Sequence, residues 1–195
     1  MRYGIDLGGT KIEIAALAED GSLKLRRRVP SPQGDYRATV AALAGLVAGA
    51  DAELGVKPTV GIGIPGTISP ATGLVKNANS VWLIGHPLDR DLGDAIGRPV
   101  RIANDADCFV LSEASDGAAA GARSVFGVIL GTGVGGGLVY EGRPIFGVNS
   151  IAGEWGHNPL PEPQVIDVTP FTPPQPSWQE PRGFLGRLGW VLTGR

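Results

Sequence analysis

The chain has 195 residues, a net charge of −2 and a hydrophobic content of 43%, so it can bury a core and is not disordered throughout. The slight acidic excess argues against a nucleic-acid-binding surface. A single cysteine, Cys108, excludes a disulfide framework, and Asp6 interrupts any signal-peptide core. The apolar stretch 125–140 is broken by glycines and is not a membrane span. We therefore expect a cytoplasmic protein that binds neither nucleic acid nor membrane.

The hydrophobic pattern predicts strands first and then alternating strands and helices. Residues 2–8 and 11–18 alternate in polarity around a glycine turn, which predicts a hairpin. A third strand over 22–29 precedes a helix over 35–54 with Asp35 as its N-cap. The later elements are strands at 59–66, 99–103, 124–130 and 136–141, and helices at 88–97 and 105–121. This order predicts an α/β protein with a mixed sheet and helices on its faces.

Two glycine-rich turns carry the residue types that bind phosphates. The sequence IDLGGTK at 5–11 places Asp6 at a strand end, followed by Gly8, Gly9, Thr10 and Lys11. The sequence LGTGVGGG at 130–137 repeats the arrangement with Gly131, Thr132, Gly133 and Gly135. A phosphate site needs backbone amides without Cβ obstruction, a hydroxyl, and a cation or metal-binding carboxylate. An ordinary glycine hairpin is the alternative for each turn, but two such turns in one chain favour phosphate binding.

A third motif, ANDAD at 103–107, follows a predicted strand and opens a predicted helix. Asn104 is the predicted N-cap, and Asp105 and Asp107 lie in the first turn, where the helix dipole favours carboxylates. Plain capping is one interpretation of this motif. The other is a general base, because the carboxyl end of a strand faces the region where α/β proteins bind ligands.

Two polar loops complete the set of candidate functional motifs. The amides of KNANS at 76–80 can orient a polyol, and GEWGH at 153–157 offers a carboxylate and an imidazole. Either loop alone is also explained by ordinary surface polarity. We assign no function to His86, expect Cys108 in the core, and interpret the arginines at 26–28 as a solvated strand end.

The motifs IDLGGTK, GIGIPG, KNANS, ANDAD, LGTGVGGG and GEWGHNPLP, in this order and spacing, resemble the ROK family of sugar kinases and repressors. Within it the chain is most similar to bacterial ATP-dependent fructokinases, also described as mannokinases, over residues 1–161. The resemblance implies an actin-like ATPase fold, which is ribonuclease-H-like, with two lobes. We expect the complete first lobe at 1–117, only the start of the second lobe at 118–160, and a tail outside the family at 161–195. That tail contains seven prolines, so we expect it to be poorly ordered.

The resemblance also implies roles for the candidate residues. Asp105 matches the catalytic base, and Asp6 would help hold Mg²⁺ beside the phosphates of ATP on the two glycine turns. The family's sugar-binding positions match Asn79, Asn104, Glu154 and His157. The implied reaction is ATP-dependent phosphorylation of a hexose at its 6-hydroxyl, with fructose as the expected substrate. The alternatives are an N-acetylglucosamine or glucose kinase of the same family, or a catalytically inactive truncated fragment.

The sequence departs from the family pattern in three respects. The family holds a structural zinc with the GEWGH histidine and a following cysteine-rich segment, but no cysteine follows Leu160 here, so we expect no zinc. Ile84 stands where the fructokinase branch usually has an asparagine. Family kinases are also much longer, so we expect the apolar face of the 124–141 hairpin to be uncovered and a homodimer to be one outcome.

Overall fold

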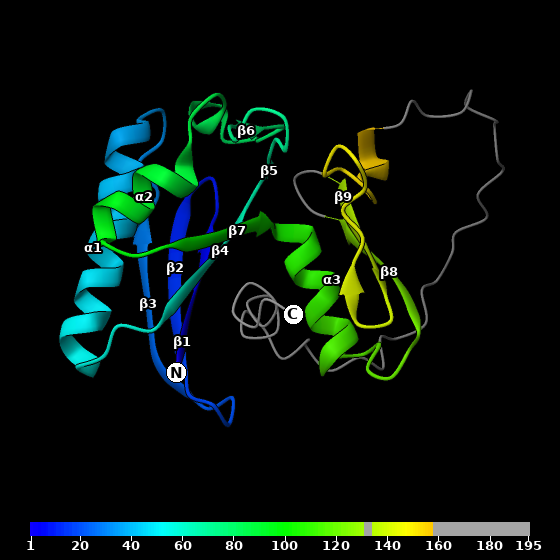
Figure 1. Cartoon of the computed structure of the whole chain (residues 1–195), viewed down its shortest axis with the longest axis horizontal. Coiled ribbons are helices and arrows are strands. Elements are labelled where there is room, and N and C mark those ends of the chain that lie inside the picture. Colours follow the sequence, from blue (N-terminus) through cyan, green and yellow to red (C-terminus); the bar gives the residue numbers. More distant parts are fainter. Residues whose placement is uncertain (131–133, 158–195) are drawn as a thin grey trace, which may run out of the picture.

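The computed structural model describes residues 1–130 and 134–157. Its larger sheet is mixed and has five strands, and it lies on the left in Figure 1. The strands lie in the order β3-β2-β1-β4-β7. Strands β1, β2 and β3 form an antiparallel meander, and β4 and β7 run parallel to β1. Their bounds are β1 Arg2–Leu7, β2 Lys11–Leu17, β3 Leu23–Pro30, β4 Thr59–Ile64 and β7 Val100–Asn104. The predicted mixed sheet is confirmed.

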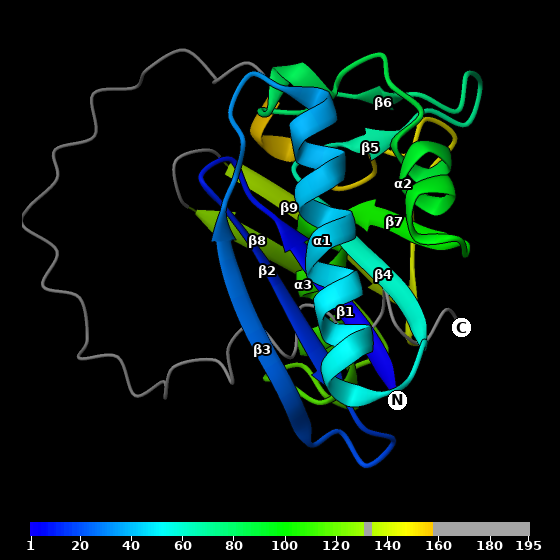
Figure 2. The same cartoon turned by 90° about the vertical axis from the view of Figure 1, so that its left-hand side faces the viewer.

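Helices α1 (Tyr36–Leu54) and α2 (Leu88–Ile96) cover one face of this sheet (Figure 2). Helix α1 begins at the predicted N-cap Asp35, whose carboxylate accepts from the Ala38 amide at 2.9 Å. It ends at Gly55, whose φ of 66° is the left-handed conformation that glycine adopts without strain. The buried side chains between helices and sheet form the main core, which includes Tyr3, Ile5, Ile12, Ile14, Leu43, Ile62, Ile64, Leu88 and Leu92.

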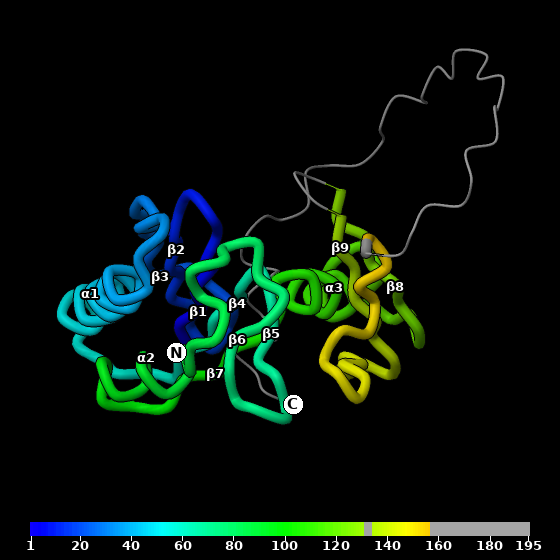
Figure 3. Tube along the Cα trace, turned by 90° about the horizontal axis from the view of Figure 1, so that it is seen from above, coloured from blue at the N-terminus to red at the C-terminus, as the bar shows by residue number. Residues whose placement is uncertain are grey.

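Helix α3 (Asp105–Ser115) follows β7 directly and lies between the large sheet and a smaller one (Figures 1 and 3). The smaller sheet has the order β10-β9-β8, with bounds β8 Ser124–Leu130, β9 Val134–Tyr140 and β10 Arg143–Pro144. The predicted helix extended to residue 121, which was wrong. The chain leaves the helix after Ser115 because Gly117 sits in a turn, where the Ala118 amide bonds to the Glu113 carboxylate at 2.8 Å.

The outward face of β8 is apolar and exposed, as predicted for the 124–141 hairpin. Phe126 is 51% exposed and Leu130 is 74% exposed, and both project away from α3. The alternate residues face the helix, where Gly127 lies so close to Val110 that a Cβ there would collide with it. Among the described residues, no helix has the length and apolar character needed to cross a bilayer.

Several short elements were not predicted from the sequence. The two-residue strands β5 (Thr67–Ile68) and β6 (Val75–Lys76) pair with each other, and single 3₁₀ turns form at η1 (Val81–Leu83) and η2 (Trp155–His157). Elements of two or three residues are too short to show a hydrophobic period. They nevertheless shape the loop that carries KNANS and the loop that carries GEWGH.

The arginines at 26–28 are exposed on β3, as expected of a solvated strand, but they also form ion pairs that the sequence analysis did not predict. Arg26 and Arg28 both bind the carboxylate of Glu13, which is only 2% exposed on neighbouring β2. Arg27 points the other way and pairs with Glu53 of α1. Strand alternation explains this division, because residues two apart share a face and the residue between them faces the opposite side.

Candidate active site

The parallel strands β1, β4 and β7 bring three of the motifs to one edge of the large sheet. Asp6 near the end of β1 pairs with Gly63 of β4, and Gly63 pairs with Ala103 of β7. A Cβ at Gly63 would lie 3.8 Å from the Asp105 α-carbon, so β4 and the start of α3 lie within contact distance of each other. Carboxyl ends of parallel strands are where open α/β sheets bind ligands.

Both the oxygen and the nitrogen of the Asn104 side chain form hydrogen bonds at the start of α3. Its oxygen accepts from the amides of Ala106 and Asp107 at 2.8 and 3.2 Å, as predicted for the N-cap. Its nitrogen donates to the Gly66 carbonyl oxygen at 3.2 Å, just beyond β4. Asn104 is 8% exposed, and its buried amide fixes the start of α3 relative to the end of β4.

Asp105 is the first residue of α3 and lies in a field of other carboxylates. Burial is the main cause that raises the pKa of the Asp105 carboxyl to about 6, and the charges of Asp6 and Glu154 raise it further. A hydrogen bond from the Ala106 amide, at 2.8 Å, opposes these effects. Asp6, Asp105 and Glu154 come from β1, α3 and the GEWGH loop, so the structure brings these motifs within electrostatic reach of one another.

Asp107, which the ANDAD motif places in the first turn of α3 and which received no specific role from the sequence, is also buried. It is 6% exposed, and burial raises its pKa to about 7, with further contributions from Glu154 and Asp105. A Cβ at Gly137 would lie 3.0 Å from its Oδ1 atom, so β9 packs directly over this carboxyl. No sequence signal distinguishes Asp107 from Asp105, because the difference arises from this tertiary contact.

The second glycine motif reaches the same place through β9. A Cβ at Gly135 would lie 3.6 Å from the Ala106 Cβ atom, next to Asp105. The Trp155 indole nitrogen donates to the Gly135 carbonyl at 3.2 Å, which fixes the GEWGH loop against β9. The candidate phosphate-loop residues Gly131, Thr132 and Gly133 lie outside the described residues. His157 belongs to η2, and its sugar-binding role stays a prediction.

The first glycine turn and the KNANS loop meet on the other side of the site. The Gly8 amide donates to the Lys11 carbonyl at 2.9 Å, which closes the turn. The Asn79 amide donates to the Pro65 carbonyl at 3.2 Å, so the loop is attached to the end of β4 and the Asn79 side chain is exposed. Beside it, the Ser80 hydroxyl oxygen lies 3.8 Å from the position of a Cβ at Gly9.

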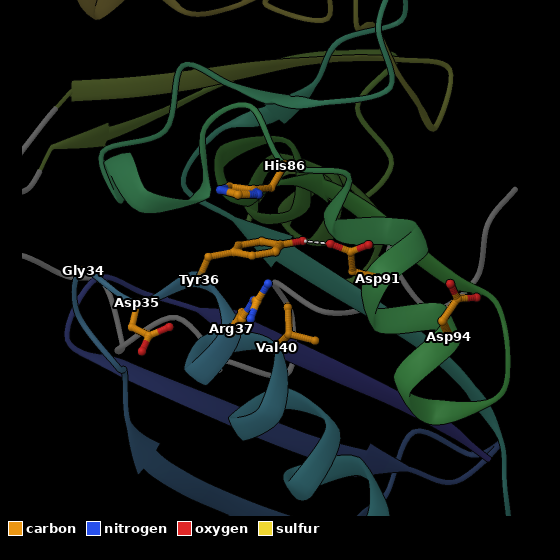
Figure 4. Close-up of a pocket in the computed structure, with 8 residues that line it drawn as sticks. All are labelled: Gly34, Asp35, Tyr36, Arg37, Val40, His86, Asp91 and Asp94. Carbon is orange, nitrogen blue, oxygen red and sulfur yellow. Dashed lines mark hydrogen bonds between the residues drawn. The ribbon is translucent and has the colours of Figure 1, made fainter.

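A separate pocket of about 660 Å³ lies between α1 and α2 (Figure 4). The rings of Tyr36 and His86 stack there with centroids 3.9 Å apart, and the Tyr36 hydroxyl donates to Asp91 at 2.6 Å. Burial, followed by this hydrogen bond, raises the pKa of the Tyr36 hydroxyl. None of its lining residues belongs to the six motifs, so this pocket is distinct from the candidate active site. The residues that line the pocket are Gly34, Asp35, Tyr36, Arg37, Val40, His86, Asp91 and Asp94.

The residues at the site suit a magnesium ion that arrives with phosphates. Within the described ranges, no three metal-ligating side chains gather closely enough to hold an ion by themselves. Mg²⁺ is commonly bound through one or two carboxylates together with substrate phosphates and water, so Asp6 beside the glycine turn fits this mode. The prediction that zinc is absent concerns His157 and stays a prediction.

The mixed sheet, with a carboxylate that opens α3 near the end of β1, is the architecture of an actin-like ATPase fold. The chain belongs to the ROK family, whose family model matches residues 2–176. That match extends past the boundary predicted at 160/161. The chain is 32% identical to a ROK family glucokinase from Streptomyces griseus, solved in complex with glucose and AMPPNP. Their structures superpose with a TM-score of 0.72 over 80% of this chain and 50% of that one.

Two curated relatives are kinases of the same sugar. The chain is 48% identical to an N-acetyl-D-glucosamine kinase of Pectobacterium atrosepticum over 168 residues, which are 86% of this chain and 55% of that protein. It is 50% identical to an N-acetyl-D-glucosamine kinase of Vibrio cholerae, over 83% of this chain and 53% of that protein. The chain therefore spans about half the length of the curated relatives it matches.

Proposed function

We propose that the site phosphorylates the 6-hydroxyl of N-acetylglucosamine with ATP. The observation that carries this proposal is the Asp105 carboxyl, which opens α3 with a pKa of about 6 among Asp6 and Glu154. The two curated relatives at 48% and 50% identity, both N-acetyl-D-glucosamine kinases, favour this sugar over the fructose expected from the motifs. We therefore replace fructose, the substrate expected from the motifs, with N-acetylglucosamine, which was one of the alternatives.

In the proposed reaction, the Asp105 carboxylate accepts the proton of the 6-hydroxyl as that oxygen attacks the γ-phosphorus and ADP leaves. A base acts best when its pKa lies near the working pH, and a pKa of about 6 leaves Asp105 ionised at neutral pH while keeping it a useful acceptor. We expect the rate to rise with pH through about 6, as the carboxyl loses its proton.

The remaining residues position the two substrates. The glycine turn at Gly8–Lys11 presents backbone amides and the Lys11 cation to phosphates, and Asp6 would hold the Mg²⁺ that neutralises their charge. Asn79 and Glu154 are proposed to bind sugar hydroxyls. Phosphoryl transfer depends mainly on such positioning and on charge stabilisation, so no further covalent chemistry is required of the protein.

A second candidate function is sugar binding without turnover. The chain spans 55% and 53% of its two curated relatives. In this second candidate the residues around Asp105 would hold the sugar without catalysing phosphoryl transfer.

An ADP-release assay on the purified chain with Mg²⁺-ATP tests both candidates. N-acetylglucosamine, glucose and fructose are compared at equal concentration, and Asp105→Asn serves as the matched inactive control. We expect the highest kcat/KM for N-acetylglucosamine, and a preference for fructose would contradict the proposed substrate. Calorimetric binding of N-acetylglucosamine without any ADP release would support the second candidate instead.

A further inference from the structure

The Ser80 hydroxyl is a buried polar group without a partner. The residue is 2% exposed, and its oxygen has no hydrogen-bond partner among the described residues. It precedes η1 but does not cap it. A buried hydroxyl without a partner is unfavourable to folding, so it is usually explained by strain or by a group that binds there in function.

The Ser80 hydroxyl lies beside the first glycine turn, which is the proposed phosphate site. A Cβ at Gly9 would lie 3.8 Å from the Ser80 oxygen, with no other atom within 4 Å apart from its immediate chain neighbours. The Ser80 hydroxyl therefore lies at contact distance from the first glycine turn, on the side where Gly9 has no side chain. The amides of Gly9 and Thr10 also donate to no other group in the described part of the chain.

Ser80 also lies beside the residue proposed to bind the sugar. Asn79 directly precedes it, and the Asn79 amide is fixed to the Pro65 carbonyl at 3.2 Å. The side chain of Asn79 is exposed whereas that of Ser80 is buried toward Gly9. The hydroxyl thus follows the proposed sugar contact in the sequence and lies beside the proposed phosphate turn in space.

We propose that the Ser80 hydroxyl donates a hydrogen bond to the phosphoryl group held on the Gly8–Lys11 turn. Ionised phosphoryl oxygens are acceptors, and a serine hydroxyl turns toward an acceptor by rotation about one side-chain bond. This inference rests on the proposed function, since it assigns a phosphate ligand to that turn. It adds a residue that none of the sequence motifs predicted for this role.

The test is calorimetric titration with Mg²⁺-tripolyphosphate, a probe that carries the phosphates without a nucleoside or a sugar. Ser80→Ala removes the donor, and Ser80→Cys keeps most of the volume with a weak donor. We expect both variants to bind tripolyphosphate about tenfold more weakly, which is the size expected for one hydrogen bond to a charged group. Ser112→Ala, a buried serine on α3 that is 3% exposed, is the matched control and keeps wild-type affinity.

Two further readouts separate this role from a structural one. Thermal unfolding of Ser80→Ala should occur at or above the wild-type temperature, because the hydroxyl makes no hydrogen bond in the free protein. Titration with N-acetylglucosamine should be unchanged, and a loss confined to that sugar would overturn the proposal in favour of a sugar contact.

The failure of this inference and that of the proposed function give different results. Equal tripolyphosphate affinity in wild type and both Ser80 variants overturns the Ser80 role and leaves the kinase proposal standing. A wild-type chain that binds no tripolyphosphate overturns both. Weaker binding in the variants supports the Ser80 role even where the wild type releases no ADP with any sugar.

Discussion

The Asn104 side-chain nitrogen lies 3.2 Å from the Gly66 carbonyl oxygen and donates to it, so a residue at the start of α3 is tied to the end of β4. The same side chain accepts two amide hydrogen bonds from the first turn of the helix. Asp105 lies between these bonds in sequence, which fixes its backbone on both sides. The proposed base is therefore oriented by its neighbour.

Replacing Asn104 separates its two structural contacts. Asn104→Ala loses the cap and the Gly66 bond, and we expect a loss of about 2 kcal/mol in the free energy of unfolding. Asn104→Ser keeps a capping oxygen and loses only the Gly66 contact, so it should lose about 1 kcal/mol. Urea unfolding followed by circular dichroism measures both. Equal stability of the alanine variant and wild type would contradict the role assigned to this side chain.

Asp105→Asn removes the proposed proton acceptor without changing the size of the side chain. We expect the rate of sugar phosphorylation to fall by roughly 10²–10⁴-fold, the usual contribution of a general base. The affinity for N-acetylglucosamine should change little, because the amide retains one acceptor oxygen. Steady-state ADP release and calorimetry on the same preparation measure the two quantities. A variant rate within roughly threefold of the wild-type rate would contradict the assignment of Asp105 as the general base.

Asp107 makes the stability of the protein depend on pH. Its pKa is about 7 in the folded state and 3.8 in the unfolded chain, so the stability that its proton confers is complete below pH 3.8 and is lost as pH rises through 7. Asp107→Asn stays neutral at every pH. We expect this variant to be more stable than wild type by about 4 kcal/mol at pH 7.5 and by much less at pH 4. Urea midpoints at both pH values measure this, and identical pH profiles would contradict it.

Two glycine-to-alanine changes should have opposite effects on stability. Gly127→Ala places a methyl group against Val110, which is fully buried, so we expect a loss of about 1–3 kcal/mol from overpacking. Gly45 lies on the exposed face of α1 with no atom near its Cβ position, so Gly45→Ala should gain about 0.5–1 kcal/mol. Thermal melts of the two variants and wild type provide the comparison. A stabilising Gly127→Ala would contradict the close packing of β8 on α3.

The longer elements were predictable because their patterns are local. Strand alternation placed β1 and β2 correctly, and the caps Asp35 and Asn104 were identified from residue type and position. The start of β9 at Val134 was predicted two residues late, because consecutive glycines carry no polarity signal. The partners of Arg26 and Arg28 could not be predicted, since Glu13 reaches them only through the register of β2 on β3.

Some features of the candidate site were also predictable from local sequence, and others depend on tertiary contacts. Asp6 and Asp105 were both identified from their positions at strand ends, and the parallel pairing of β1, β4 and β7 brings them to one sheet edge. The burial of Asp107 and the isolation of Ser80 depend on Gly137 and Gly9, which approach them from distant parts of the chain. No local pattern encodes such contacts. The lobe boundary at 117/118 and the homodimer stay predictions.

Helix α3 touches both sheets, and the proposed base is its first residue. The small sheet packs along α3, and Asn104 bonds the start of α3 to the Gly66 carbonyl of the large-sheet side. A substitution in β8 or β9 can therefore disturb the proposed base through the helix, although those strands are distant from Asp6 in the sequence.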